Sequence, residues 1–239
     1  MSGERSRGTE RPEIEDLLAP PWHTTALICL IVAVAATGTW LSRAGGPAAA
    51  PATGSPLVAL YLPMILVQWG LTLYVCRIGR PRNALPQLIG RGWTRLLGPV
   101  VLDVALAALV WVLIEASEAA AGRHGGARSA AALAMLPHTA LERATWVLVA
   151  ASAGFCEEVV YRGYLQTQLT AFTGRASLGI VLQSILFGIA HGEQGHAPAM
   201  RFAAYGCVFG VLARWRRSLL PGIACHIGID FASGLLTPR

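Results

Sequence analysis

The segment that decides the fold is residues 144–165, which read ATWVLVAASAGFCEEVVYRGYL. As a helix it is long enough to cross about 30 Å of hydrocarbon. Its second half nevertheless carries Glu157, Glu158 and Arg162. Charged side chains inside a membrane are costly, so they usually face the interior of a helix bundle and mark a functional site. We therefore interpret this segment as a transmembrane helix that carries polar groups inward.

The composition of the whole chain agrees with a membrane protein. Hydrophobic residues make up 54% of the 239 residues and charged residues 13%, whereas a soluble domain is about one quarter charged. Apolar segments of membrane-spanning length predict an all-α, polytopic transmembrane bundle of about seven spans around an intramembrane cavity. An eighth, partial span is a further possibility at residues 129–136. The seven expected spans cover residues 24–42, 57–77, 96–115, 144–165, 176–192, 200–213 and 219–236.

The distribution of arginines predicts the orientation. With seven spans, the basic segments all fall on one side, which the positive-inside rule identifies as cytoplasmic. These segments are the N-terminal arginines, the loop at 77–95, Arg175 and the cluster at 214–217. We expect a multi-pass protein of the cell membrane with a cytoplasmic N-terminus. The net charge of +6 is spread among loops, which favours contact with the lipid bilayer and argues against a nucleic-acid partner.

The charged residues of the fourth span differ in what they can pair with. Glu158 and Arg162 are four residues apart, so they share one helix face and can form an ion pair. Glu157 points about 100° away from that face and is left without the arginine. A buried carboxylate without a cationic partner is a candidate general base. A structural ion pair would explain Glu158 and Arg162 but would leave Glu157 unexplained.

Polar residues recur in two later spans. His191 lies near the end of the fifth span, and His226 and Asp230 lie one helical turn apart in the seventh. Each of them could be a packing residue whose polar side chain is hydrogen-bonded within the helix bundle. A rise of about 1.5 Å per residue, however, brings them and Glu157 to the middle third of the bilayer. This shared depth predicts one common site.

Other polar residues in the spans carry less weight. Asp103 stands alone in the third span, where it could serve the same site or stabilise the edge of a loop. Tyrosine and glutamine side chains elsewhere fit packing or interface roles, and we do not take them as signs of chemistry. They are Tyr61, Gln68, Tyr74 and Tyr205.

The order of these residues resembles the three-motif signature of the CPBP intramembrane proteases. That family includes the type II CAAX prenyl endopeptidases and the bacterial Abi, or bacteriocin-immunity, proteins. The resemblance covers residues 136–236 as the catalytic core, leaving 1–23 as a polar N-terminal segment and 24–135 as scaffold helices. The motifs are Glu157-Glu158-x-x-x-Arg162, Phe187-x-x-x-His191 and His226-x-x-x-Asp230.

The resemblance implies an endopeptidase that cleaves a membrane-associated or CAAX-like peptide. Glu157 with His191 would activate a water, and His226 with the residue at 230 would stabilise the oxyanion. Glu158 and Arg162 would support them. Position 230 is often Asn in the family. Because an ionised aspartate cannot donate a hydrogen bond, Asp230 must be protonated, orient His226 or bind a metal.

The sequence is compatible with more than one metal content and with more than one function. Glu157, His191 and His226 would suit zinc as a two-histidine, one-carboxylate set with an open water position, but a metal-free glutamate mechanism is equally compatible with these residues. The partner would be a peptide or a membrane-protein substrate. The main alternative function is a non-enzymatic immunity or scaffold protein of the same fold. A proton-coupled transporter is less favoured, since the sequence has no evident repeated halves.

Overall fold

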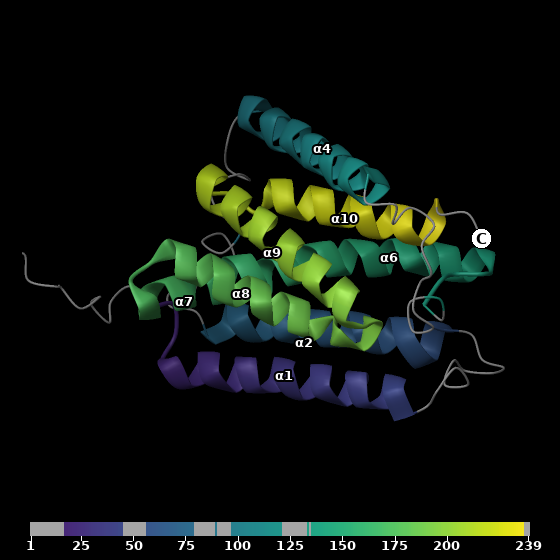
Figure 1. Ribbon diagram of the computed structural model, residues 1–239, viewed down its shortest axis with the longest axis horizontal. Coiled ribbons are helices and arrows are strands. Elements are labelled where there is room, and N and C mark those ends of the chain that lie inside the picture. The colour runs from purple at the N-terminus through teal and green to yellow at the C-terminus, as the bar shows by residue number, and fades with distance from the viewer. Residues whose placement is uncertain are drawn as a thin grey trace, which may run out of the picture.

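The computed structural model describes residues 17–44, 56–78, 89, 97–120, 133 and 135–236. Throughout these ranges the regular elements are helices, so the predicted all-α bundle is confirmed (Figure 1). In chain order the elements are α1 (Pro21–Ala44), η3 (Leu57–Tyr61), α2 (Leu62–Ile78), α4 (Leu97–Ala120), α6 (Ala140–Glu157), η5 (Glu158–Leu165), α7 (Gln166–Thr173), α8 (Ala176–Ala190), η6 (Gly192–Gln194), α9 (His196–Arg216) and α10 (Leu220–Leu235).

Each expected span coincides with a helix, although the helices differ in length. Within the described residues, four helical stretches are long and apolar enough to cross a membrane: Pro21–Ala44, Leu57–Ile78, Gly98–Ser117 and Ala140–Thr173. Two shorter apolar helices, α8 and α10, follow. The fourth stretch continues about two turns beyond the expected end at residue 165. Most of the partial span considered at 129–136 lies outside the described residues, as do the N-terminal arginines.

Exposed tryptophans mark the two ends of α1. Trp22 and Trp40 have 64% and 66% of their surface exposed, and their separation along the helix corresponds to about 27 Å. This distance is close to the thickness of the hydrocarbon layer, and tryptophan is enriched at both membrane–water interfaces. The helix therefore has the length and the anchors of a membrane span.

The start of α6 is fixed by a capping box. The Thr139 hydroxyl accepts from the backbone N–H of Glu142 at 3.2 Å, and the Glu142 carboxylate accepts from the backbone N–H groups of Thr139 and His138 at 3.0 and 2.7 Å. Such a box satisfies N–H groups that have no partner within the helix. The helix thus begins at Ala140, four residues before the expected span at 144–165, and this start sets the register that carries Glu157 to the end of α6.

Helix α6 packs between helices from both halves of the chain. Figure 1 shows α4 and α1 at opposite edges, with α6 between them. Helix α10 lies along α6 on one side, and α2 lies against it on another. Gly154 permits the close approach of α10, because a Cβ there would lie 2.8 Å from the backbone nitrogen of Ile227. The bundle thus brings α2, α6 and α10 together around one region.

Candidate active site

The centre of the site is the junction of α6 and η5. Glu157 is the last residue of α6, and Glu158 is the first residue of the π-helix η5. The expected ion pair forms, since Arg162 Nη1 lies 2.9 Å from Glu158 Oε1 with both side chains fully buried. Because both side chains are buried, the ion pair is not screened by solvent. The site also includes a π-helical turn, an uncommon feature that occurs frequently at functional sites.

Aromatic rings surround the Arg162 guanidinium. Its central carbon lies 4.3 Å from the centroid of the Phe187 ring and 5.4 Å from that of Phe209. Cations are attracted to the faces of aromatic rings, and more strongly where water is excluded. Arg162 is thus held in place by the rings and by Glu158, which in turn fixes the Glu158 carboxylate beside α10.

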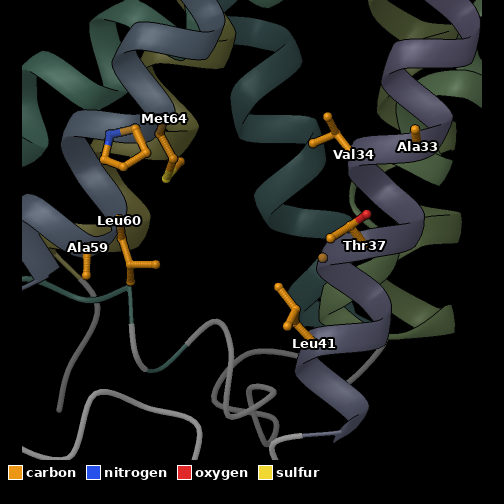
Figure 2. Close-up of a pocket in the computed structure, with 9 residues that line it drawn as sticks. Ala33, Val34, Thr37, Leu41, Ala59, Leu60 and Met64 are labelled. Carbon is orange, nitrogen blue, oxygen red and sulfur yellow. The ribbon is translucent and has the colours of Figure 1, made fainter.

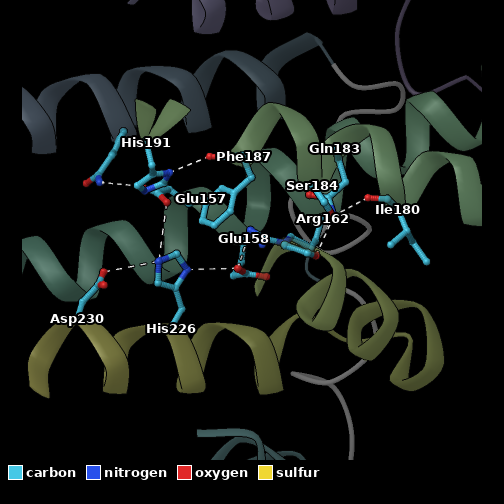
Figure 3. Close-up of polar contacts among 12 residues, drawn as sticks. Glu157, Glu158, Arg162, Ile180, Gln183, Ser184, Phe187, His191, His226 and Asp230 are labelled. Atoms are coloured by element: carbon cyan, nitrogen blue, oxygen red, sulfur yellow. Dashed lines mark hydrogen bonds and ion pairs between the residues drawn. The ribbon is translucent and has the colours of Figure 1, made fainter. Parts of the chain in front are cut away.

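His226 of α10 faces three carboxylates (Figure 3). Its Nδ1 lies 3.3 Å from Glu158 Oε1, while its Nε2 lies 3.8 Å from Glu157 Oε2 and 3.6 Å from Asp230 Oδ2. An ionised carboxylate only accepts hydrogen bonds, so Nδ1 is the donor toward Glu158. Nε2 then carries a hydrogen only in the imidazolium form. These contacts place Glu158 where it can orient the ring.

The backbone of Asp230 forms a hydrogen bond with a side chain of α6. The indole Nε1 of Trp146 donates to the Asp230 carbonyl at 2.9 Å, and Trp146 lies so close to α10 that a Cβ at Gly234 would overlap its ring. The side chain of Asp230 faces His226 Nε2 from the same helix, one turn away. This contact suits orientation of His226 and also a protonated Asp230 that donates to a neutral Nε2, which are two of the three roles considered.

His191 borders the same cluster from α8. It lies just past the end of α8 rather than inside the span, and its Nδ1 is 2.8 Å from the Phe187 carbonyl oxygen. Because a carbonyl only accepts, Nδ1 is the donor, and in the neutral ring Nε2 is left as an acceptor. The Phe187 ring lies 4.7 Å from the His191 ring and 5.9 Å from the His226 ring. The two imidazoles therefore flank one phenyl group.

Glu157 has a polar partner that the sequence did not suggest. The side-chain amide of Gln68 on α2 donates to Glu157 Oε1 at 3.2 Å. We had expected Gln68 to serve packing or an interface. A lone amide in the otherwise apolar span 57–77 was the available signal, but nothing in the sequence indicated which span it would face.

Asp103 does not join the cluster. Its carboxylate lies 2.7 Å from Nε of Arg216, at the end of α9. Of the two roles considered for Asp103, this contact matches stabilisation near a loop, because it fastens α4 to the start of the turn between α9 and α10. The polar cluster of the described residues thus contains Glu157, Glu158, Arg162, His191, His226 and Asp230 but not Asp103.

A separate groove lies away from this cluster, between α1 and the η3–α2 segment (Figure 2). It has a volume of about 580 Å³, and its walls run from Ala33 to Leu41 on α1 and from Ala59 to Met64 on the other side. No titratable side chain lines it. Its lining can accommodate apolar chains but offers no acid or base, so it is distinct from the candidate active site.

The residues as arranged do not fit a metal. Within the described residues, no group of three or more His, Cys, Asp or Glu side chains is placed so that it could hold a metal ion. The zinc set of Glu157, His191 and His226 is therefore not preformed, and we derive no step through a metal.

The described helices and this buried carboxylate–histidine cluster define a helical membrane protein with a polar site inside its bundle. Residues 139–232 match the family model described as Type II CAAX prenyl endopeptidase Rce1-like. The match confirms the CPBP resemblance over this segment, which is less than half of the chain and is similar to the Rce1-like family of CAAX-type proteases. No curated protein and no solved structure matches the chain significantly.

Proposed function

We propose that this protein is an intramembrane endopeptidase in which Glu157 is the general base for hydrolysis of a peptide bond. One observation carries the proposal: Glu157, His226 and Asp230 converge although they come from two helices, with His226 Nε2 directed between the two carboxylates. Helix packing alone does not require an acid and an imidazole to meet in this way. The similarity of residues 139–232 to the family model supports the reaction class.

The first half of the reaction is attack by water. Glu157 and the free Nε2 of His191 are both acceptors, and together they can hold a water by its two hydrogens. Glu157 takes one proton as the water oxygen forms a bond to the substrate carbonyl carbon. The electron pair of the carbonyl π bond moves to its oxygen. Because His191 is kept in one tautomer by the Phe187 carbonyl, it accepts without competing as a donor.

The second half is stabilisation and collapse of the tetrahedral intermediate. In the imidazolium form, His226 donates its Nε2–H to the developing oxyanion, as a preorganised donor must. Glu158 orients the ring by accepting from Nδ1–H. Asp230 faces the single Nε2–H before the substrate binds, and this N–H then donates to the oxyanion. When the C–N bond breaks, Glu157 returns its proton to the leaving nitrogen. The products are a carboxylic acid and an amine.

The substrate in this proposal is a membrane-associated peptide or protein, including CAAX-like sequences. The candidate site lies within helices of apolar composition, so a peptide bond reaches it from the lipid or from a membrane–water interface. The proposed topology is multi-pass with a cytoplasmic N-terminus, on the basis of the arginine distribution. This orientation would give a substrate access from the cytoplasmic side.

The test is cleavage of a tagged library of membrane-associated peptides by the full chain in liposomes. Wild type is compared with Glu157→Ala and His226→Ala, each with and without a chelator. We expect products from wild type alone, in both conditions. Cleavage abolished by the chelator and restored by zinc would instead support a metal-dependent variant of the site. Absence of cleavage by folded wild-type protein would favour the non-enzymatic immunity or scaffold alternative.

A further inference from the structure

The described part of α2 meets the candidate site through one side-chain hydrogen bond, that of Gln68 with Glu157. Helix α2 lies outside the segment that matches the family model, residues 139–232. We propose that Gln68 is a positioning residue, which holds the Glu157 carboxylate in the orientation that the reaction needs. This inference rests on the proposed role of Glu157 as the general base.

The geometry gives the two oxygens of Glu157 different surroundings. Oε1 accepts from the Gln68 amide at 3.2 Å, and Oε2 lies 3.8 Å from His226 Nε2. The Glu157 side chain is 20% exposed, so without a polar contact its carboxylate could turn out of the plane that faces His226. The amide donor opposes that rotation. One carboxylate oxygen therefore stays on the side of His226.

The position of Gln68 is itself fixed by residues that follow it on α2. The Thr72 hydroxyl donates to the Gln68 backbone carbonyl at 2.9 Å. The adjacent Trp69 donates from Nε1 to the Ser152 hydroxyl of α6 at 3.1 Å, and its ring stacks on Phe155 with centroids 5.7 Å apart. Of these contacts, the stacked rings of Trp69 and Phe155 fix the register of α2 against α6. The approach of the amide to Glu157 is thus determined by packing and is not a chance contact of a mobile side chain.

A packing role leaves one feature of Gln68 unexplained. Its Oε1 is buried and has no hydrogen-bond partner among the described residues. A buried polar atom without a partner costs free energy, and an apolar side chain at this position would fill the space without that cost. Glutamine is therefore favoured over an apolar residue at position 68 only if its side-chain N–H donor is needed. A neutral donor also suits a base, because it orients the carboxylate without neutralising it as a lysine or arginine would.

The experiment measures kcat and KM for peptide cleavage by the full chain in liposomes, together with thermal unfolding in detergent. Gln68→Leu keeps the approximate size and removes the amide. Gln68→Glu keeps the length but places a carboxylate against Glu157. The matched control is Trp69→Phe, which removes the neighbouring hydrogen bond to Ser152 while keeping an aromatic ring on Phe155.

We expect Gln68→Leu to lower kcat about tenfold or more, as loss of a hydrogen bond to a charged group does, with KM within about twofold of wild type and an unchanged unfolding temperature. Gln68→Glu lowers kcat at least as far, because like charges repel. Trp69→Phe retains the wild-type kcat. The proposal is overturned if Gln68→Leu keeps the wild-type kcat, or if it and Trp69→Phe lose activity equally.

A parallel measurement on Glu157→Gln separates this inference from the proposed function. If Glu157→Gln is inactive while Gln68→Leu is fully active, Glu157 remains the base and only the role of Gln68 is wrong. If Glu157→Gln cleaves at the wild-type rate, the proposed function fails and the role of Gln68 fails with it.

Discussion

Nδ1 of His226 lies 3.3 Å from Oε1 of Glu158, and neither side chain is more than 7% exposed. This contact separates the roles of two adjacent glutamates. Glu158 is occupied by an arginine and a histidine, so it is an orienting group. Glu157 faces the other ring nitrogen and has no arginine against it in the described ion pairs. The proposal therefore assigns Glu158 as a support and Glu157 as the base.

The Glu158–Arg162 ion pair is expected to be essential for folding as well as activity. Arg162→Met leaves Glu158 buried without its cation, and removing one partner of a buried pair typically costs about 3–5 kcal/mol. The double variant Glu158→Met/Arg162→Met, which leaves neither charge behind, is expected to unfold at a higher temperature than the single variant. Thermal unfolding in detergent checks this. Equal unfolding temperatures for Arg162→Met and wild type would contradict a buried pair.

Asp230→Asn is expected to keep cleavage within about tenfold of wild type. The amide oxygen can still face His226 Nε2, and the amide nitrogen gains donors that an ionised carboxylate lacks. Asp230→Ala, which can neither accept nor donate, is expected to lose more activity than Asp230→Asn. Initial cleavage rates of the two variants decide the point. A less active Asn variant would mean that the negative charge itself is required.

Close packing of α6 on α10 predicts a contrast between two glycines. Gly154→Ala would place a Cβ 2.8 Å from the Ile227 backbone nitrogen, whereas a Cβ at Gly228 meets nothing within 4 Å. We expect Gly154→Ala to lower both the unfolding temperature and cleavage, because the helices must separate. Gly228→Ala is expected to be neutral or stabilising by up to about 1 kcal/mol. Similar behaviour of the two variants would argue against this close approach.

A substitution at Asp103 tests whether this residue lies outside the active site. Asp103→Asn weakens the contact with Arg216 but leaves every contact of Glu157 and His226 in place. We expect cleavage within about twofold of wild type and a modest loss of stability, since Arg216 is 16% exposed and stays partly solvated. A loss of activity comparable to that of Asp230→Ala would place Asp103 in the mechanism after all.

Local patterns account for what could be predicted from the sequence. Apolar segment length predicted the helices, and four-residue spacing predicted the Glu158–Arg162 contact, because both depend on neighbours along one helix. The π-helical geometry of η5 has no comparable sequence pattern, and its occurrence was not predicted. Depth within the bilayer indicated that His226 and Glu157 would meet, which the structure shows at 3.8 Å.

Contacts between spans that are distant in the chain could not be predicted from the sequence. The partner of Glu157 on α2 is 89 residues away, and the partner of Asp103 is 113 residues away. Periodicity states which face of a helix is polar but not which helix lies opposite. For this reason Gln68 was assigned to packing, and Asp103 was held open between two roles.

The central claim is that Glu157 is the base, and the most direct measurement is the initial cleavage rate of Glu157→Gln in liposomes. This variant keeps the size of the side chain and its contact with Gln68 through the amide oxygen, but it cannot take a proton. We predict a rate at least about 100-fold below wild type, with unchanged thermal unfolding. A folded Glu157→Gln protein that cleaves at the wild-type rate would contradict the account.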